Sequence, residues 1–343
     1  MSLLLQNKGM SRLELGRESG LSAQTISVIV RSLEQDGLVV RGEAQRGRVG
    51  PPTIPMSLNP EGAFSLGVSV GSRATDIVLI DFLGKVRFRE AFYYDTPALQ
   101  AVKAFLAQTV PEVVNRLKPN SRNRIIGMGV ALPSTIQSWP KVGGDNDWKE
   151  FDFETFLAPL TDLPIFIQND ITAAASAESL FGEAKSLNDY LFFFIGARTH
   201  NRLILNQRIY AGNAGPELKP NLPGVLTLEK MIGGQETKTS QLWRFEEDWS
   251  AFGQTVDEWT TECRDALCVA TSQLCTFIDV RTVVVSGITP PRIQRSICEQ
   301  LEVNLQGIDV VAANVGPLGK AIGAASLPFI SRFMVHDDVE HSV

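Results

Sequence analysis

Cysteine, histidine and long apolar runs are scarce in this sequence of 343 residues. Its four cysteines and three histidines lack the spacing of a zinc site, which excludes the common structural zinc modules. No run of about 18 apolar residues is present that could span a bilayer, and the apolar stretch Leu3–Leu5 is soon followed by polar residues, unlike a signal peptide. We therefore expect a cytoplasmic protein with no metal site and no membrane partner.

The rest of the composition is that of a folded protein with more than one core. Hydrophobic residues make up 44% of the chain and charged residues 20%, and the length is sufficient for two or three buried cores. The net charge of −6 is uneven, because residues 1–60 carry seven Lys and Arg against five Asp and Glu. A mildly basic head on an acidic body suits an anionic partner at one end.

Two helix starts lie close together near the N-terminus. Ser11 and Glu14 have the spacing of a capping box, which predicts a short helix that ends at a glycine turn. Ser22 is then the N-cap of a second helix that continues to about Asp36. Two short helices joined by a glycine turn are typical of the helix-turn-helix, whose second helix enters the DNA major groove.

The second helix is predicted to have a buried face and a DNA-facing face. Ile26, Val30 and Leu33 recur at helical spacing and should point inward. The predicted DNA contacts are the N-cap and the outward polar side chains, Ser22, Gln24, Thr25, Ser27 and Arg31. An ordinary helical hairpin with solvated arginines is the alternative.

A β-wing is predicted to follow this helix. Residues 37–40 and 53–58 have the character of two strands, and the segment between them is rich in Gly and Arg. Arg46 and Arg48 in this tip are suited to contact phosphates or a narrow minor groove. Helix, cap, helix and basic wing in this order predict a DNA-binding domain over residues 1–60.

The remaining chain, 61–343, has an α/β pattern in two halves, approximately 61–180 and 181–343. A β-hairpin over 65–84 opens the first half. Strands are predicted at 85–93, 125–132, 163–167, 190–195, 203–205, 281–285 and 310–311, and helices at 99–117, 171–181, 261–277 and 319–328. The insert 235–257 fits no element by its pattern.

Several segments resemble the ROK family (repressors, open reading frames and sugar kinases), in particular its transcription-factor branch. The join of residues 47–52 to Ser57-Leu-Asn-Pro60 is similar to that branch's linker, and Gln168–Ala175 is similar to the family's Glu-Asn-Asp-Ala-Asn-Ala-Ala segment. Residues 127–133, 283–287 and 321–325 resemble further family segments. The resemblance implies a winged helix-turn-helix followed by a two-lobed, actin-like sugar kinase fold.

The sequence departs from the family's kinases where they bind nucleotide phosphates. Ser69 stands where the kinases have an Asp, and residues 196–202, Gly-Ala-Arg-Thr-His-Asn-Arg, replace a glycine-rich turn. Bulky side chains in that turn would fill the space that phosphates need. The family's zinc module is also absent, since residues 212–234 contain no Cys or His. These departures predict a protein that is not an enzyme and has no cofactor.

The resemblance also implies a sugar pocket. Asn169 corresponds to the family's sugar-binding Asn, Asp170 to the kinase base and Glu217 to a sugar-binding Glu. Asn and Asp after a strand can equally cap the next helix, so a sugar-like effector, a vestigial pocket and a pocket retuned to another ligand all stay open. The leading hypothesis is a repressor of carbohydrate-related genes that binds operator DNA as a homodimer or dimer of dimers. The alternatives are an ATP-dependent hexose kinase and an interaction scaffold without a ligand.

Overall fold

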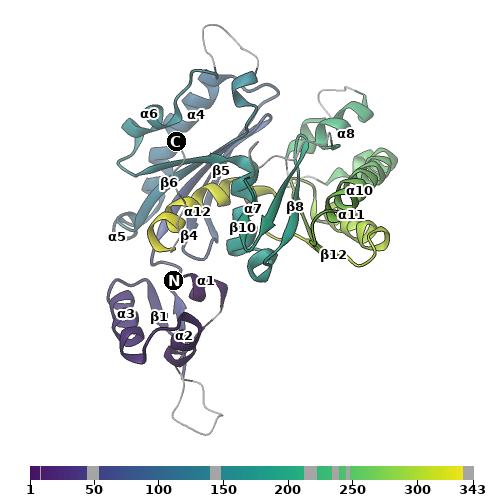
Figure 1. The fold of residues 1–343 in the computed structure, drawn as a ribbon. Helices are drawn as coiled ribbons and strands as arrows, with labels where there is room; N and C mark the ends of the chain where they lie inside the picture. The colour runs from purple at the N-terminus through teal and green to yellow at the C-terminus, as the bar shows by residue number, and fades with distance from the viewer. Residues whose placement is uncertain are drawn as a thin grey trace.

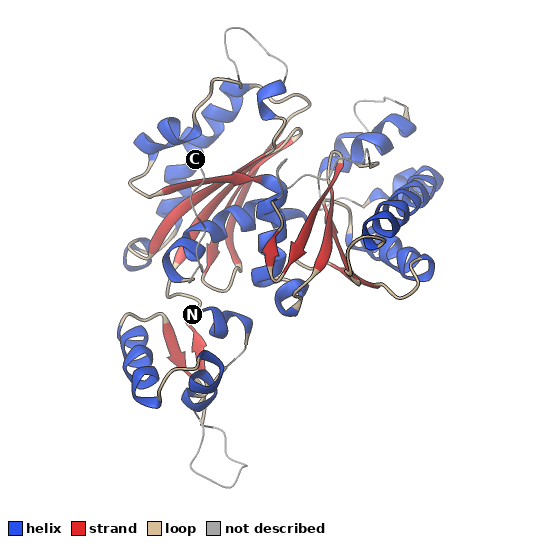
Figure 2. Ribbon diagram, in the orientation of Figure 1, coloured by secondary structure: helices blue, strands red, loops and turns tan. Residues whose placement is uncertain are grey.

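The structure is a computed structural model that describes residues 1–7, 9–44, 54–139, 148–211, 222–233, 239–244 and 248–334. These residues form a small N-terminal head and two larger lobes, and each lobe is built on one β-sheet (Figure 1). Helices pack on the faces of both large sheets (Figure 2), which is the predicted α/β architecture.

The described part of the head contains α1 (Ser2–Gln6), α2 (Arg12–Ser19), α3 (Ala23–Gln35), β1 (Val39–Arg41) and β2 (Met56–Leu58). The capping box of Ser11 and Glu14 is formed at the start of α2, and Gly20 ends that helix in the left-handed conformation at φ 69°. β1 and β2 pair antiparallel as the stem of the predicted wing. Arg46 and Arg48, at its predicted tip, lie outside the described residues.

The first lobe contains a five-stranded sheet in the order β5-β4-β3-β6-β7. Its strands are β3 (Phe64–Val70), β4 (Ala74–Asp81), β5 (Val86–Tyr93), β6 (Ile125–Leu132) and β7 (Ile165–Asn169). β3, β4 and β5 pair antiparallel, whereas β3, β6 and β7 are parallel. α4 (Leu99–Arg116) packs its apolar face, including Val102 and Leu106, on one side of this sheet. The smaller helices of this lobe are α5 (Pro119–Arg122) and α6 (Phe153–Leu157).

The second lobe repeats this strand plan in the order β10-β9-β8-β11-β12. Its strands are β8 (Tyr190–Ile195), β9 (Thr199–Leu205), β10 (Arg208–Ile209), β11 (Thr282–Gly287) and β12 (Asp309–Ala312). An antiparallel β8–β9 pair is again followed by parallel neighbours, β11 and β12. α8 (Val225–Ile232), α10 (Gly253–Cys275) and α11 (Pro291–Asn304) belong to this lobe. Their apolar side chains, with Trp249 and Trp259, form the core on one face of its sheet.

Two helices, α7 (Asp170–Phe181) and α12 (Gly319–Phe333), lie on the remaining face of the first sheet (Figure 1). α12 follows the second lobe in sequence but packs on β3 and β6 of the first. An added Cβ at Gly67 would lie 2.0 Å from the carbonyl oxygen of Ala321, and one at Gly129 would lie 1.9 Å from that of Ala324. Only glycine permits this approach, so the two glycines fix where the last helix packs.

The structure differs from the predicted elements at several ends. α10 begins at Gly253, eight residues before the predicted start, and takes up part of the insert 235–257. β9 begins at Thr199 instead of 203, and α12 continues beyond Pro328. The elements without a counterpart among the predicted ones include α1, α5, α6, α8, α11 and β10. Within the described ranges, no helix combines the length and the apolar character needed to cross a membrane.

Candidate nucleic-acid interface and inter-lobe cleft

The N-terminus of α3 is exposed and held by its cap. The Ser22 hydroxyl accepts a hydrogen bond from the Thr25 amide at 3.1 Å, and the hydroxyl groups of the two residues lie 2.8 Å apart. A second hydroxyl, that of Ser27, donates to the carbonyl of Ala23 at 2.8 Å. Three of the five DNA contacts predicted on this helix therefore also hold the helix itself.

The other two contacts predicted on α3, Gln24 and Arg31, are exposed on its outer face. Ile26 and Val30 are buried on the inner face, as their spacing predicts, and Leu33 is partly buried. Val28, also on the outer face, is 65% exposed. An exposed helix N-terminus with a glutamine and an arginine on its open face has the geometry of a major-groove helix.

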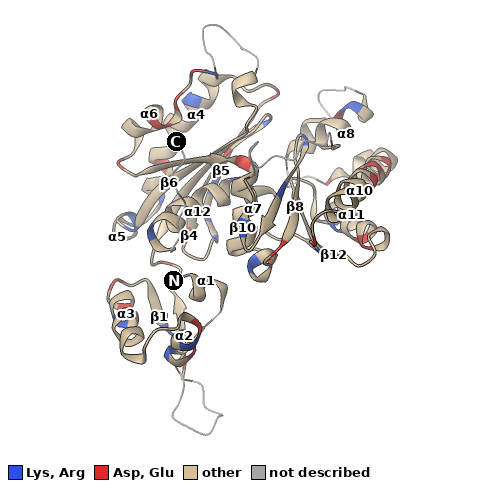
Figure 3. Ribbon diagram, in the orientation of Figure 1, with Lys and Arg blue, Asp and Glu red and all other residues tan. Residues whose placement is uncertain are grey.

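Two arginines of the head, Arg12 and Arg41, lie next to the Glu34 carboxylate. Arg41 donates to Glu34 through Nε at 2.5 Å and Nη2 at 2.9 Å, and Arg12 lies 3.7 Å from the same carboxylate. The hydrogen bond from Arg41 keeps the pKa of Glu34 below its usual value. Figure 3 shows Lys and Arg together with Asp and Glu on the head helices, so charge of both signs is present there.

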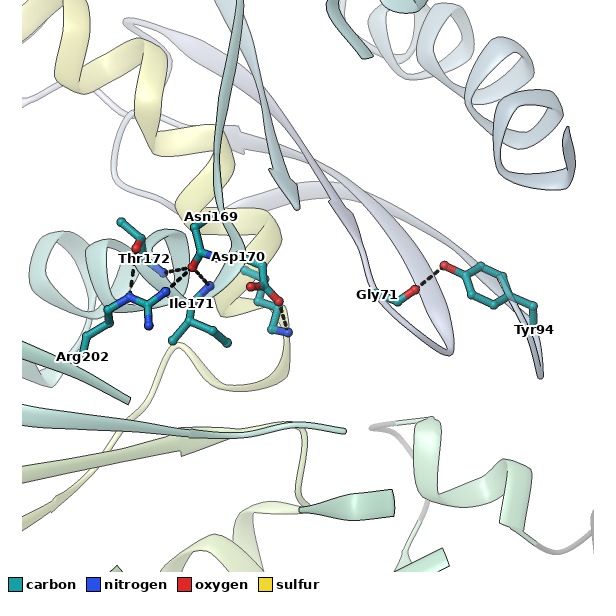
Figure 4. Close-up of polar contacts among 8 residues, drawn as sticks. Gly71, Tyr94, Asn169, Asp170, Ile171, Thr172 and Arg202 are labelled. Atoms are coloured by element: carbon teal, nitrogen blue, oxygen red, sulfur yellow. Dashed lines mark hydrogen bonds and ion pairs between the residues drawn. The ribbon is translucent and has the colours of Figure 1, made fainter. Parts of the chain in front are cut away.

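In the body, Asn169 lies where β7 ends and α7 begins. Its Oδ1 accepts hydrogen bonds from the amides of Ile171 at 3.0 Å and Thr172 at 3.1 Å, which makes it the N-cap of α7. The same oxygen also accepts a hydrogen bond from the guanidinium of Arg202 (Figure 4). The helix-capping alternative therefore describes this side chain in the structure.

The prediction that residues 196–202 form one phosphate-type turn is wrong, because Arg202 lies in a strand. The turn ends at Arg198, and residues 199–202 belong to β9, where Arg202 pairs with Phe192 of β8. Strand alternation turns Arg202 toward α7, where it is fully buried. It donates from Nε to the Thr172 hydroxyl at 3.0 Å and from Nη1 to the Asn201 carbonyl at 2.7 Å.

Asp170 is the first residue of α7 and is 4% exposed. Its Oδ2 lies 2.5 Å from Nζ of Lys320, in the first turn of α12. The Lys320 ammonium also lies over the Phe194 ring, 4.8 Å from its centroid. Sequence patterns do not predict Lys320, because its partner lies 150 residues away in the chain. Glu217, the third predicted ligand contact, lies outside the described residues.

A cleft lies between the lobes beside this ion pair. It is bounded by the β3–β4 turn, the ends of β4 and β5, the turn at Gly196, Trp243 and the start of α12. Its volume is about 670 Å³ when the space open to solvent is included. Ser69, at the position of the kinase Asp, lies on its wall and is buried.

Arg73 connects the two lobes across the cleft. Its Nη2 lies 2.7 Å from the Glu229 carboxylate of α8, and its guanidinium lies over the Trp243 ring at 5.3 Å. Arg244 in turn lies 5.1 Å from the ring centroid of Tyr93 in β5. These contacts join the turn of the first lobe to the second lobe.

The cysteines and acidic residues offer no evident metal chemistry. Within the described ranges, no group of three or more His, Cys, Asp or Glu side chains is arranged to hold a metal ion. The four cysteines are free thiols, and burial raises the pKa of Cys298 to about 12. A buried thiol of this kind packs as a small apolar side chain.

The head and the two repeated lobes define a class: a winged helix-turn-helix joined to a two-lobed body of the sugar kinase type. Residues 1–40 match the family described as winged helix-turn-helix DNA-binding, and residues 65–218 match the ROK family. Residues 65–218 are therefore similar to the ROK family, and residues 1–40 are similar to winged helix-turn-helix DNA-binding domains. This agrees with the resemblance that the sequence motifs indicate.

Named relatives are similar over part or most of the chain. The xylose repressor of Bacillus spizizenii is 25% identical over 214 residues, 62% of this chain and 56% of the repressor, so the match spans about half of the repressor's length. An uncharacterized protein of Sinorhizobium fredii, y4fQ, is 27% identical over 97% of this chain and 90% of its own. The crystal structure of a ROK family transcriptional regulator, a homolog of E. coli MLC protein, superposes with a TM-score of 0.63 at 19% identity, covering 95% of this chain and 93% of that one.

Proposed function

We propose that the protein is a DNA-binding transcriptional regulator, a repressor of the ROK family that controls carbohydrate-related genes. The exposed N-terminal half of α3 on a winged helix-turn-helix head carries this proposal. The xylose repressors among its relatives support the repressor assignment and the link to carbohydrate genes. Binding to a chromosomal operator implies a cytoplasmic protein.

The body acts in this proposal as a sensor that has lost kinase chemistry. Phosphoryl transfer depends on positioned phosphates and charge stabilisation at a bare backbone turn. Three features oppose it here: Ser69 replaces an acid, Arg198 lies in the second turn, and Arg73 crosses the cleft to Glu229. The alternative, a hexose kinase with an accessory head, requires an ATP site among these side chains.

A sugar or sugar derivative is the proposed effector. Asp170 is the predicted contact that keeps a charged acceptor next to the cleft, although Lys320 now holds it. Asn169 has its oxygen engaged by α7 and Arg202, so its part in ligand binding is limited to the amide nitrogen. Glu217 completes the proposed set from the sequence alone.

We also propose a homodimer, or a dimer of dimers, on a palindromic operator. A two-fold symmetric dimer places two α3 helices about one turn of the DNA apart, which matches two half-sites. The effector changes the spacing of the heads in this scheme, since allosteric coupling requires a ligand that prefers one arrangement of the lobes.

Selection of bound duplexes from a random DNA library by the full chain tests the proposal. The expected result is one enriched palindrome, retained by the chain without ATP. A parallel assay measures ATP-dependent phosphorylation of a hexose panel. Enrichment of no sequence, together with phosphorylation above background, would replace the regulator by the kinase alternative.

A further inference from the structure

An arginine of the body lies where the C-terminal end of α3 meets the first lobe. Arg124 follows α5 and precedes β6, at the edge of the first lobe that faces the head (Figure 1). Its Nη1 lies 3.2 Å from the carbonyl oxygen of Gly62 and 3.5 Å from those of Gly37 and Glu61. Gly37 belongs to the head, whereas Glu61 and Gly62 belong to the connection between β2 and β3. One guanidinium of the body therefore contacts both the head and the connection.

Gly37 ends α3 and presents its carbonyl oxygen to this joint. Its amide donates to the carbonyl of Glu34 at 3.0 Å, and the amide of Leu38 donates to that of Leu33 at 2.9 Å, which is a Schellman turn. Gly37 has a φ of 71°, and an added Cβ there would lie 2.9 Å from Nη2 of Arg124. The guanidinium thus packs against bare backbone at the end of the helix, where the negative end of the helix dipole favours a cation.

Asn59 attaches the connection to the same carbonyl. Its Nδ2 donates to the Gly37 carbonyl at 2.7 Å, and its amide donates to the Leu38 carbonyl at 2.9 Å. In the body, the amide of Phe64, the first residue of β3, donates to the Arg124 carbonyl at 2.9 Å. Hydrogen bonds therefore lead from the end of α3 to β3 and β6, which are neighbouring parallel strands of the first sheet.

Apolar and polar contacts make different contributions at this joint. Leu58 of the head lies in one apolar cluster with Phe82 and Phe329 of the body, and burial of such side chains has little dependence on direction. Hydrogen bonds, in contrast, weaken steeply when the donor moves out of line. The apolar cluster holds the head to the body, and the carbonyl groups around Arg124 restrain the angle at which it is held.

We propose that Arg124 is a positioning residue for DNA binding. It fixes the angle of α3 relative to the first lobe, and so the direction in which each head of a dimer meets its half-site. This role rests on the proposed function, because it concerns how the regulator presents α3 to the operator. Arg124 acts through Gly37 and the connection 59–63, without touching DNA. A rearrangement of the first sheet that moves β6 would tilt α3 through the same contact.

Fluorescence anisotropy with two duplexes tests this role. One duplex carries the full selected palindrome and the other a single half-site, and the readout is the ratio of the two affinities. Arg124→Gln should lower this ratio by about three- to tenfold, because the second head is no longer held in the direction of its half-site. A smaller folded fraction would weaken both duplexes equally and leave the ratio unchanged. Arg124→Lys keeps a cationic donor and should restore part of the ratio.

Arg122→Gln is the matched control. Arg122 lies in the neighbouring α5, and its guanidinium donates to the carbonyls of Leu117 and Asn115 within the first lobe, each at 2.9 Å. Its affinity ratio should equal that of the wild type. A second measurement needs no DNA: hydrogen exchange of the free protein, followed by mass spectrometry. Peptides that cover residues 36–40 and 58–64 should exchange faster in Arg124→Gln than in the wild type or in Arg122→Gln.

Three results would overturn the role of Arg124 and leave the proposed function standing. Unchanged exchange in Arg124→Gln would mean that this side chain does not hold the joint. Faster exchange with an unchanged affinity ratio would mean that the joint does not direct the heads. An equal fall of the ratio in Arg122→Gln would mean that the effect is not specific to the joint. Binding of neither duplex by the wild type would instead overturn the proposed function, and this role with it.

Discussion

Hydroxyl side chains cap the starts of two helices in the head, α2 and α3. Ser22 is the clearest case, because its side chain satisfies an amide at the exposed N-terminus of α3. We expect Ser22→Ala to lower the free energy of unfolding by about 1 kcal/mol. Urea denaturation of the full chain measures it.

The control for this prediction is Ser32→Ala, an exposed position inside the same helix. Alanine is the better helix former there, so stability should be unchanged or slightly higher. Equal losses in the two variants would show that the cap contributes nothing beyond the general effect of removing a hydroxyl.

Glu178 of α7 predicts a pH dependence of stability. Its side chain is fully buried and accepts a hydrogen bond from the Val315 amide at 2.8 Å, and burial raises the pKa of its carboxyl above the usual value. In the unfolded chain the carboxyl loses its proton at the ordinary pKa. Stability from this group is therefore full below that value and is lost as the pH rises toward the raised folded pKa.

Urea unfolding across the acidic to neutral range measures this slope. The variant Glu178→Gln should lose less stability than the wild type as the pH rises, because its side chain does not titrate. Glu258→Gln, at an exposed position of α10, should show the same slope as the wild type. A slope that is identical in all three proteins would show that Glu178 does not titrate differently on folding.

At this scale the sequence predicts local features and not the partners of distant residues. The caps at Ser11, Ser22 and Asn169 follow from spacing within a few residues. By contrast, Arg202 and Lys320 contact Asn169 and Asp170 from other elements, and only the fold brings them together. The sequence alone suggests that Asn169 caps the next helix. It does not suggest that Arg202 donates a hydrogen bond to the same oxygen.

Among the elements, α12 is the one whose position depends most on glycine. We expect Gly129→Ala to destabilise the body by about 1–3 kcal/mol, because the new Cβ would lie 1.9 Å from the Ala324 carbonyl oxygen. Thermal unfolding followed by circular dichroism measures the loss. The matched control is Gly319→Ala, whose Cβ would make only ordinary contacts, at 3.8 Å or more. A loss in the control as large as that in Gly129→Ala would refute the close-packing explanation.

Sequence patterns predict an element best when it is long enough for its hydrophobic period to repeat several times. The strands of the first lobe, and its helices α4 and α7, lie within a few residues of their predicted bounds, whereas the short helices α5 and α6 were not predicted. α11 was missed although Pro291 at its first position and the apolar spacing of Ile293, Ile297 and Leu301 are helix signals. α1, with five residues, is too short for any period to appear. The predicted strand at 203–205 is shorter than β9, because Asn201 and Arg202 are polar and the sequence pattern does not reveal that they are buried.

In the whole molecule, the head and the first lobe share one continuous apolar cluster. Leu4, Met56 and Leu58 of the head belong to the same cluster as Phe82 and Phe329 of the body. The Phe82 ring lies 5.2 Å from that of Phe329 and 5.0 Å from that of Phe333. α12 therefore contacts the cleft at its first turn and the head at its last.

This continuity predicts that the head does not unfold independently of the first lobe. All five Trp residues lie in the body, so Trp fluorescence reports the body, and far-UV circular dichroism reports head and body together. In the wild type the earliest loss of helix should coincide with the fluorescence change. Phe82→Ala should let the head unfold first, with helix lost before fluorescence changes. Separate transitions already in the wild type would show that the shared cluster does not couple the two parts.

The most direct test of the account is the equilibrium affinity of the full chain for its selected operator and for a scrambled duplex, measured by fluorescence anisotropy. We predict that Gln24→Ala lowers discrimination at one operator position by about 1–3 kcal/mol. Arg46→Ala and Arg48→Ala should instead weaken binding to both duplexes and lower its salt dependence. Wild-type affinity and discrimination in all three variants would contradict the claim that α3 and the wing bind DNA.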